Sequence, residues 1–270
     1  MPHFTYECIT YHYRIHGEGA PLVLLHGFTA SLANWEPLLS SLARFHRVII
    51  VDLPGHGRTI APDSPAYHTM EQTAAGMAAF IDQIVAEPVH LLGYSMGGRL
   101  ALYFARHYPV LVRSLLLESA SPGLTTDEER ATRRIRDEAL AARIERDGIP
   151  AFVDFWETIP LFASQAKLSD SVRTRLRAQR LRNRVDGLAN SLRGMGTGAQ
   201  PSLWLRLAEV RAPTLLMAGE HDAKFCAIAQ AMAERMCNSS LVVIPGAGHT
   251  IHLERPNTFI RHTLTWLHNK

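Results

Sequence analysis

The sequence predicts a single α/β domain, in which a mostly parallel sheet is covered by helices on both faces. Short runs of Val, Ile and Leu recur along the chain, and segments with helical periodicity separate them. Strands that are apolar along their whole length are typical of a parallel sheet that is buried on both sides. A chain of 270 residues with 47% hydrophobic and 20% charged residues is long enough to build one large core. The apolar runs lie at residues 21–27, 47–55, 88–95, 113–119, 213–219 and 241–248.

Two parts of the chain depart from this alternation. Residues 4–17 alternate polar and apolar side chains, which predicts an antiparallel hairpin at the edge of the sheet. Between residues 122 and 207 the strand signals stop and helical patterns continue, so we expect a helical cap inserted between the sixth and seventh strands. The core domain then comprises residues 1–121 and 208–270. The cap holds more than half of the arginines of the chain, interleaved with acidic residues that can pair with most of them.

Composition and charge restrict the possible classes of function. A formal net charge of +3 is too small an excess for a nucleic-acid-binding surface. The N-terminal residues lack the features of a signal peptide, and the apolar run at 110–120 is too short to cross a bilayer. Cys8, Cys226 and Cys237 have no spacing typical of a metal site or a disulfide framework. We therefore expect a cytoplasmic protein with no nucleic-acid partner and no membrane insertion.

A serine lies at the junction of the predicted third parallel strand and the helix that follows. Gly93, Ser95 and Gly97 form the pattern G-x-S-x-G. In this pattern the serine occupies a strained turn, and the glycines on either side leave room for its backbone, so its hydroxyl projects from the carboxyl edge of the sheet. This geometry predicts that Ser95 acts as a nucleophile or a base.

Two backbone N–H groups are expected to form an oxyanion hole near this serine. Met96 begins the predicted helix, so its N–H has no partner within the helix and faces a region where negative charge is stabilised. The second N–H is expected from Phe28, in the turn after the first parallel strand, where Gly27 permits the backbone path.

A serine hydroxyl needs a base that takes its proton, and the sequence offers a histidine and an acid in a suitable order. Asp222 follows one predicted strand, and His249 follows the last strand through a glycine-rich loop. The chain order Ser95, Asp222, His249 is that of the α/β-hydrolase fold, in which the histidine accepts the serine proton and the acid orients the imidazole.

Other residues near these positions are less favoured candidates. His221 and His252 are neighbours of the predicted acid and base, and either could in principle serve as the base. Glu118 is the main rival acid, because it ends a strand that also faces the site. The position of Asp222 in the loop after its strand favours Asp222 over Glu118 as the acid of the triad.

The remaining motifs do not indicate a cofactor or a metal. The glycine-rich segment 193–199 has no strand before it, which argues against a dinucleotide site. Neither an H-E-x-x-H motif nor paired cysteines occur, so no metal site is predicted. Residues 52–57 are interpreted as a structural turn that leaves a strand.

Several longer segments, taken together, resemble one family of menaquinone-pathway lyases, the 2-succinyl-6-hydroxy-2,4-cyclohexadiene-1-carboxylate synthases. The resemblance covers nearly the whole chain. The turn around Ser95 and residues 52–57 occur throughout the α/β-hydrolase superfamily, whereas the cap segments and the loop around Asp222 are specific. The segments that carry the resemblance are 93–99, 119–138, 155–163, 187–204 and 219–225.

The resemblance implies a reaction, the absence of a cofactor and the class of substrate. The reaction is elimination of pyruvate from 2-succinyl-5-enolpyruvyl-6-hydroxy-3-cyclohexene-1-carboxylate, which yields 2-succinyl-6-hydroxy-2,4-cyclohexadiene-1-carboxylate. The resemblance also implies that the enzyme needs no cofactor and uses a hydrolase triad for proton abstraction. Its partner is then a small polycarboxylate substrate.

The resemblance also implies which residues contact that substrate. Arginine binds a carboxylate through two parallel hydrogen bonds, and Arg99, one helical turn after Ser95, is the most informative residue outside the triad. By similarity to the family, Tyr94 and Arg133 also contact the substrate, and Trp156 helps to form the pocket wall. A further cap arginine is expected, which is one of Arg180, Arg182 and Arg184, with Arg180 favoured.

Two alternatives to the lyase remain open on the sequence alone. A serine hydrolase, whether a carboxylesterase, a thioesterase or a carbon–carbon hydrolase, would share the triad and differ only in its pocket. A non-catalytic binding protein of the same fold is disfavoured by the complete set of predicted catalytic groups. Arg99 and the arginine-rich cap favour the lyase over the hydrolase.

Overall fold

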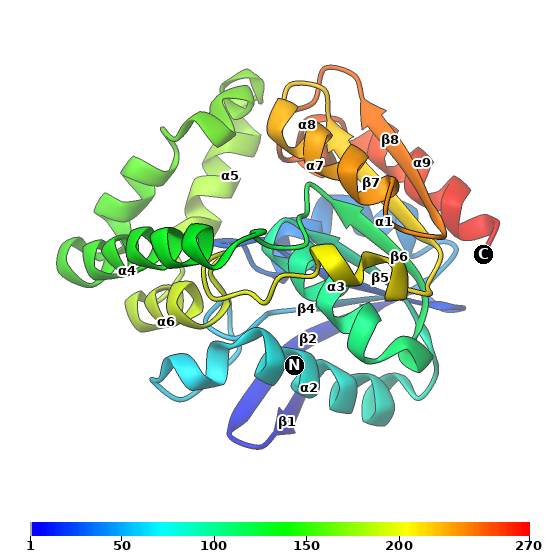
Figure 1. Ribbon diagram of the computed structural model, residues 1–270, viewed down its shortest axis with the longest axis horizontal. Coiled ribbons are helices and arrows are strands. Elements are labelled where there is room, and N and C mark those ends of the chain that lie inside the picture. Colours follow the sequence, from blue (N-terminus) through cyan, green and yellow to red (C-terminus); the bar gives the residue numbers. More distant parts are fainter. Residues whose placement is uncertain (1) are drawn as a thin grey trace.

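The computed structural model describes residues 2–270 and contains one eight-stranded sheet with helices on both faces (Figure 1). The strand order is β1-β2-β4-β3-β5-β6-β7-β8, in which β2 is antiparallel to both of its neighbours, β1 and β4, and every pair from β4–β3 onward is parallel. The predicted α/β class and the antiparallel hairpin at the edge are confirmed. The strands are β1 (His3–Tyr6), β2 (Ile9–His16), β3 (Pro21–Leu25), β4 (Arg47–Val51), β5 (Val89–Tyr94), β6 (Val112–Glu118), β7 (Thr214–Gly219) and β8 (Ser239–Ile244).

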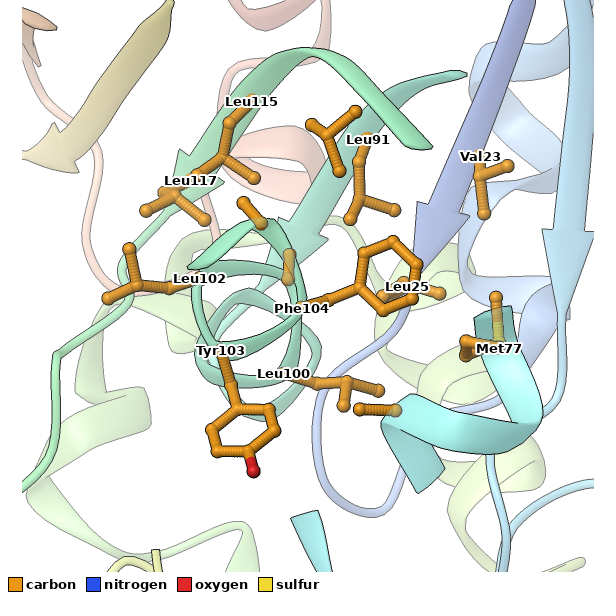
Figure 2. Close-up of a cluster of buried hydrophobic side chains, with 14 of the residues drawn as sticks. Val23, Leu25, Met77, Leu91, Leu100, Leu102, Tyr103, Phe104, Leu115 and Leu117 are labelled. Atoms are coloured by element: carbon orange, nitrogen blue, oxygen red, sulfur yellow. The ribbon is translucent and has the colours of Figure 1, made fainter. Parts of the chain in front are cut away.

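Helices cover the sheet because its central strands are apolar on both sides. Alternate residues of β3 show this: Val23 and Leu25 pack with one group of helices, and Leu22 and Leu24 with the other. The first group is α2 (Met70–Phe80), α3 (Met96–His107) and α7 (Ala223–Ala233); the second is α1 (Glu36–Leu42), α8 (Ile251–Glu254) and α9 (Pro256–His268). Figure 2 shows the first face, where Leu100 and Phe104 of α3 meet the strand residues.

Only helices and loops lie between the end of β6 and the start of β7, as expected for a cap. They include α4 (Asp127–Trp156), α5 (Asp170–Arg180), α6 (Val185–Met195) and the 3-10 segment Pro160–Lys167. These helices lie together at one side of the sheet, green to yellow-green in Figure 1. Helix α4 is interrupted at Gly148, which has φ +75° two residues before Pro150. The division at residues 122–207 stays a prediction.

Within residues 2–270, no helix combines the length and the apolar content that crossing a bilayer requires.

One buried histidine on the central sheet predicts an acid-sensitive contribution to stability. His90 on β5 forms a hydrogen bond with Ser114 Oγ at 2.8 Å, and burial, followed by the neighbouring His46 and Arg113, lowers its pKa to about 4. The unfolded chain binds a proton at this residue near its ordinary pKa of 6.5. Between pH 6.5 and pH 4 the unfolded state therefore binds more protons, and the free energy of unfolding falls as the pH falls.

We expect His90→Gln to reduce this acid sensitivity. The drop in Tm between pH 7 and pH 4.5, measured by circular dichroism, should be smaller in the variant than in the unaltered protein. His46→Gln removes a second histidine whose pKa burial lowers and also removes a neighbour that lowers the pKa of His90, so it should reduce the acid sensitivity as well. Equal drops in His90→Gln and the unaltered protein would contradict the assignment.

Candidate active site

Ser95 stands at a sharp turn between β5 and α3, as the sequence predicts. Its backbone has φ +50° and ψ −106°, a strained conformation for a residue with a side chain. A Cβ on Gly93 would meet Gly97 O at 2.3 Å, and one on Gly97 would meet Leu25 O at 2.3 Å. The two glycines therefore allow strand and helix to pack closely enough to raise Ser95 above the sheet edge.

The structure brings Ser95, His249 and Asp222 into one hydrogen-bonded chain. His249 Nε2 lies 3.0 Å from Ser95 Oγ, and His249 Nδ1 lies 2.6 Å from Asp222 Oδ2. The imidazole is 1% exposed and is flanked by the rings of Phe225 and Tyr94. A buried carboxylate on Nδ1 keeps the proton there, so Nε2 is free to accept the proton of the serine.

Glu118, the rival acid, is engaged elsewhere. Its carboxylate accepts hydrogen bonds from His252 Nδ1 at 2.8 and 2.9 Å and from the His252 backbone N–H at 3.0 Å. The other ring nitrogen of His252 lies 2.6 Å from Asn34 Nδ2. Both members of this pair are buried, behind the ring of Tyr94. His221 is exposed. The structure therefore pairs Asp222, and not Glu118, with the histidine that contacts Ser95.

Phe28 and Met96, the predicted oxyanion-hole residues, line the same pocket as Ser95. Phe28 lies in a tight turn that is closed by a hydrogen bond of 3.2 Å from Ala30 N to Gly27 O. Met96 is the first residue of α3. Within the described residues, neither backbone N–H has a hydrogen-bond acceptor. Both donors are thus available to a ligand oxygen near Ser95.

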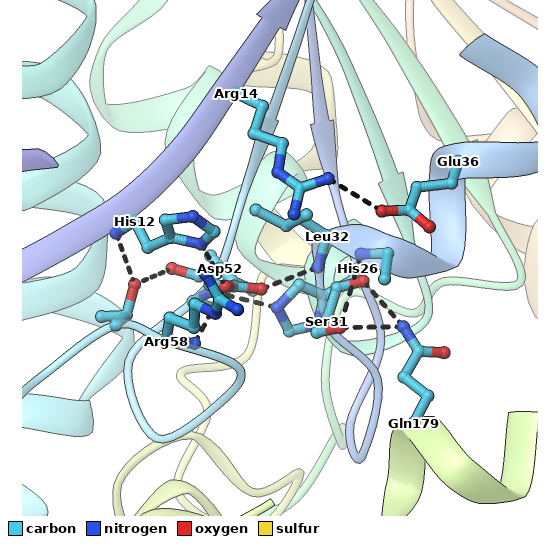
Figure 3. A network of polar contacts seen from close by, with 12 residues as sticks. His12, Arg14, His26, Ser31, Leu32, Glu36, Asp52, Arg58 and Gln179 are labelled. Atoms are coloured by element: carbon cyan, nitrogen blue, oxygen red, sulfur yellow. Dashed lines mark hydrogen bonds and ion pairs between the residues drawn. The ribbon is translucent and has the colours of Figure 1, made fainter. Parts of the chain in front are cut away.

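Asp52, a residue of the core, holds the loop that follows β3 and contains Phe28 (Figure 3). Its carboxylate accepts hydrogen bonds from Leu32 N at 2.7 Å and from Arg58 N at 2.9 Å, and it contacts His12 Nδ1 at 2.8 Å. These bonds join the loop after β3 to residues 52–57. The interpretation of residues 52–57 as a structural turn agrees with these contacts.

The pocket above Ser95 has a volume of about 340 Å³ and a marked charge asymmetry. Arg99, Arg133 and Lys224 line it, and among the described residues no Asp or Glu does. The rest of the wall is mostly aromatic and aliphatic, with serines at several points. A pocket with this lining is suited to an anionic ligand that carries an apolar ring.

Arg99 lies buried in this pocket without an acidic partner. Its Nη1 donates to the neutral Gln200 Oε1 at 2.9 Å, and no carboxylate of the described residues forms an ion pair with it. Burial, and then the nearby charge of Arg133, lowers its pKa to about 10, so it stays protonated at neutral pH. An unpaired buried charge is costly, which favours a role in binding an anion.

Arg133 and Trp156 lie on the pocket wall, as the family resemblance implies. Arg133 is half-buried, and its Nε donates to Asp137 Oδ1 at 2.7 Å, which leaves the rest of the guanidinium for a ligand. Trp156 packs against Phe28 and Phe162, with ring centroids 5.5 and 5.7 Å away. Its indole N–H is buried and has no acceptor among the described residues.

Tyr94 presents its ring to the pocket, whereas its hydroxyl points away. The hydroxyl forms a hydrogen bond of 2.9 Å with Thr250 Oγ1, next to the catalytic histidine candidate. Burial, the largest cause, raises the pKa of Tyr94. The structure therefore supports a ring contact of Tyr94 with a ligand rather than a hydrogen bond.

Arg180 lies outside the pocket of Ser95. It is buried in the cap, where it donates to Glu157 Oε1 at 3.2 Å and Gln165 Oε1 at 3.0 Å, with Phe162 between it and the triad. Arg182 is exposed, and Arg184 donates to the Thr59 carbonyl. A direct substrate contact of Arg180 stays a prediction that needs its side chain to leave Glu157.

Lys224 is a pocket residue that the sequence analysis missed. It lies two residues after Asp222, at the start of α7, and forms no ion pair within residues 2–270. The sequence contained a signal for it, because Lys224 follows Asp222 within segment 219–225, one of the segments that carry the family resemblance. The number of cations that face the pocket became evident only from the fold.

Comparisons with known proteins place the chain in a family. The model of the alpha/beta hydrolase fold family matches residues 20–256. A Bacillus subtilis (strain 168) protein with the provisional name 2-succinyl-6-hydroxy-2,4-cyclohexadiene-1-carboxylate synthase is 48% identical over 238 residues, which are 88% of this chain and 86% of that protein. The synthase of Salmonella paratyphi C is 34% identical, with 88% of this chain and 90% of that protein covered.

A solved structure agrees with the sequence relatives. The structure of MenH from S. aureus has a TM-score of 0.91 and 36% sequence identity, and the match covers 96% of this chain and 98% of that chain. The protein is an enzyme of the α/β-hydrolase superfamily. Within that superfamily, the chain belongs to the family of the 2-succinyl-6-hydroxy-2,4-cyclohexadiene-1-carboxylate synthases.

Proposed function

We propose that the protein is a lyase of menaquinone biosynthesis that eliminates pyruvate from 2-succinyl-5-enolpyruvyl-6-hydroxy-3-cyclohexene-1-carboxylate. The product is 2-succinyl-6-hydroxy-2,4-cyclohexadiene-1-carboxylate. The observation that carries this proposal is the buried Arg99, which shares a pocket with Ser95 and has no acidic partner. A neutral ester substrate would leave that charge uncompensated.

The triad can perform this elimination by proton transfer alone. The Ser95 oxygen, activated by His249, removes the proton on the ring carbon that bears the succinyl ketone. The electron pair of the broken C–H bond forms the new ring double bond, the existing double bond shifts by one position, and the bond to the enolpyruvyl oxygen breaks. Enolpyruvate leaves and takes up a proton to become pyruvate. Atoms and electrons balance without a change of oxidation state.

The two backbone donors have a defined task in this scheme. Removal of the proton places negative charge on the succinyl ketone oxygen as the enolate forms. The N–H groups of Phe28 and Met96 are available near Ser95 and would stabilise that oxygen. Such donors act without reorganisation, because the turn and the helix that carry them are already in place.

The charges of the pocket match the three carboxylates of the proposed substrate. The ring, the succinyl group and the enolpyruvyl group each carry one carboxylate, and the pocket presents Arg99, Arg133 and Lys224. An arginine can bind a carboxylate through two parallel hydrogen bonds, whereas a lysine supplies a compact charge. The aromatic wall at Phe28 and Trp156 can cover the six-membered ring.

Two parallel assays distinguish this lyase from a serine hydrolase with the same triad. We expect the protein to release pyruvate from the enolpyruvyl substrate. The coupled oxidation of NADH by lactate dehydrogenase measures this release. Intact-mass spectrometry during turnover should show no covalent adduct on Ser95, because the serine accepts only a proton. Slow hydrolysis of a p-nitrophenyl ester is the comparison. An accumulating acyl adduct, together with faster ester hydrolysis than pyruvate release, would favour the hydrolase.

A further inference from the structure

The turn that presents the Phe28 N–H contains a residue in an unfavourable backbone conformation. Thr29 has φ +66°, and the hydrogen bond from Ala30 N to Gly27 O closes the turn around it. A turn with positive φ at its third residue normally has glycine or asparagine there. A β-branched residue at this position is strained, so an isolated turn of this sequence would tend to relax.

A buried side chain of the cap holds this strained residue in place. Asn183, between α5 and α6, is 9% exposed, and its Nδ2 donates to Thr29 O at 2.7 Å and to Arg180 O at 3.0 Å. The same amide group therefore ties the end of a cap helix to the turn of the core. Core side chains hold the loop on either side of Thr29: His26 Nδ1 lies 2.8 Å from Gly27 O, and Asp52 accepts from Leu32 N. Among the described residues, the side chain that bonds to Thr29 O is that of Asn183.

A second cap side chain contacts the same loop and provides a natural comparison. Gln179 on α5 donates to Ser31 Oγ at 2.8 Å, as Figure 3 shows. This contact lies two residues beyond Thr29, outside the Gly27–Ala30 hydrogen bond. It joins cap and core as the Asn183 bond does, but it does not hold the Thr29–Ala30 peptide group, whose N–H donates to Gly27 O and closes the turn.

We infer that Asn183 is a positioning residue that holds the turn of Thr29 so that the Phe28 N–H faces the ligand oxygen. The cap is thereby part of the oxyanion hole, and a shift of the segment around Asn183 disorganises the hole. The inference rests on the proposed function in one respect: negative charge must develop on an oxygen near Ser95 during the reaction. A serine hydrolase would meet the same requirement.

The direct test is the kinetics of Asn183→Ala beside Gln179→Ala. Removal of an oxyanion-hole donor typically lowers kcat about 100- to 1,000-fold, and loss of its positioning is expected to cost less, roughly 10- to 100-fold. KM should change little, because the donor acts on charge that forms in the transition state. Gln179→Ala should keep kcat near that of the unaltered protein. Equal losses in both variants, or a loss in KM alone, would overturn the inference.

A rescue experiment separates positioning from general destabilisation. Glycine adopts positive φ without strain, so Thr29→Gly in the Asn183→Ala background should restore most of kcat. A purely structural role of Asn183 predicts that the double variant is worse than the single one. Tm is recorded for all variants, and kinetics are measured well below the lowest Tm. Should Asn183→Ala not fold, Asn183→Leu keeps the side-chain volume and removes the donor.

A probe that reacts with Ser95 independently of the proposed substrate tests the role of Asn183 separately from the lyase proposal. The phosphoryl oxygen of a fluorophosphonate occupies the oxyanion hole while Ser95 is labelled. The labelling rate should fall in Asn183→Ala, stay unchanged in Gln179→Ala and recover with Thr29→Gly. If this pattern holds without any pyruvate release, the lyase proposal fails and the role of Asn183 stands. Unchanged labelling of Asn183→Ala would refute that role.

Discussion

Replacement of Ser95 or of His249 with alanine is expected to lower kcat for pyruvate release by at least about 100-fold. Positioned acid–base catalysis typically contributes 10²- to 10⁴-fold, and the two side chains lie 3.0 Å apart, within reach for proton transfer. Steady-state kinetics at saturating substrate measure the effect, and Tm checks that each variant is folded. A loss below about tenfold in both variants would show that the triad assignment is wrong.

Paired variants of the two candidate acids test which of them serves the base. Asp222→Asn should lower kcat severely, because an amide at 2.6 Å from His249 Nδ1 favours the wrong tautomer. Glu118→Gln is the matched control, since it changes a carboxylate that bonds to His252. It should lower Tm and leave most of kcat. The opposite pattern, with Glu118→Gln as the crippling change, would identify Glu118 as the acid.

Arg99→Ala is expected to lower kcat/KM for the polycarboxylate substrate by roughly 10- to 100-fold. A charged hydrogen-bonded contact contributes on the order of 1.5 to 3 kcal/mol. Arg99 has no carboxylate of the described chain to satisfy it, so the substrate is the partner that the variant loses. Hydrolysis of a neutral p-nitrophenyl ester, if measurable, should stay within a fewfold of the original rate. KM should also depend less on ionic strength.

Two further variants sharpen the interpretation of Arg99. Arg99→Lys keeps the charge and loses the planar pair of donors, so it should also impair the enzyme. Arg146→Ala removes an exposed cap arginine that pairs with Asp147 and does not line the pocket, so it controls for net charge. If Arg99→Ala lowers Tm and both activities in parallel, Arg99 stabilises α3 and does not bind substrate.

Local signals explain how much of the fold was predictable. The apolar runs that became β3 to β7 are continuous because both faces of these strands are buried, and the pattern is visible without any partner strand. The G-x-S-x-G spacing carries its own geometry, since the glycines remove the Cβ atoms that would collide in the turn. The positions of Ser95, Asp222 and His249 after strands were therefore readable from the chain.

Contacts between distant segments could not be read in this way. Glu118 ends β6 and Asp222 follows β7, and only the tertiary packing decides that His252 bonds to Glu118 and His249 bonds to Asp222. The pairing of Arg180 with Glu157 depends on how two cap elements meet, so the sequence did not predict that it lies outside the pocket. The same holds for Lys224, an exposed residue that also lines the pocket, because its position at the pocket depends on where α7 packs.

The sequence by itself determined the α/β class, the helical cap between two strands, the strained serine turn and the family. These properties depend on periodicity and short motifs, which are local consequences of backbone geometry. The tertiary structure alone decided which acid meets which histidine, which arginines lack an acidic partner, and how Asn183 holds the strained turn at Thr29. Each of these depends on the distance between side chains far apart in the chain, and that distance is set by the packing of the whole core and cap.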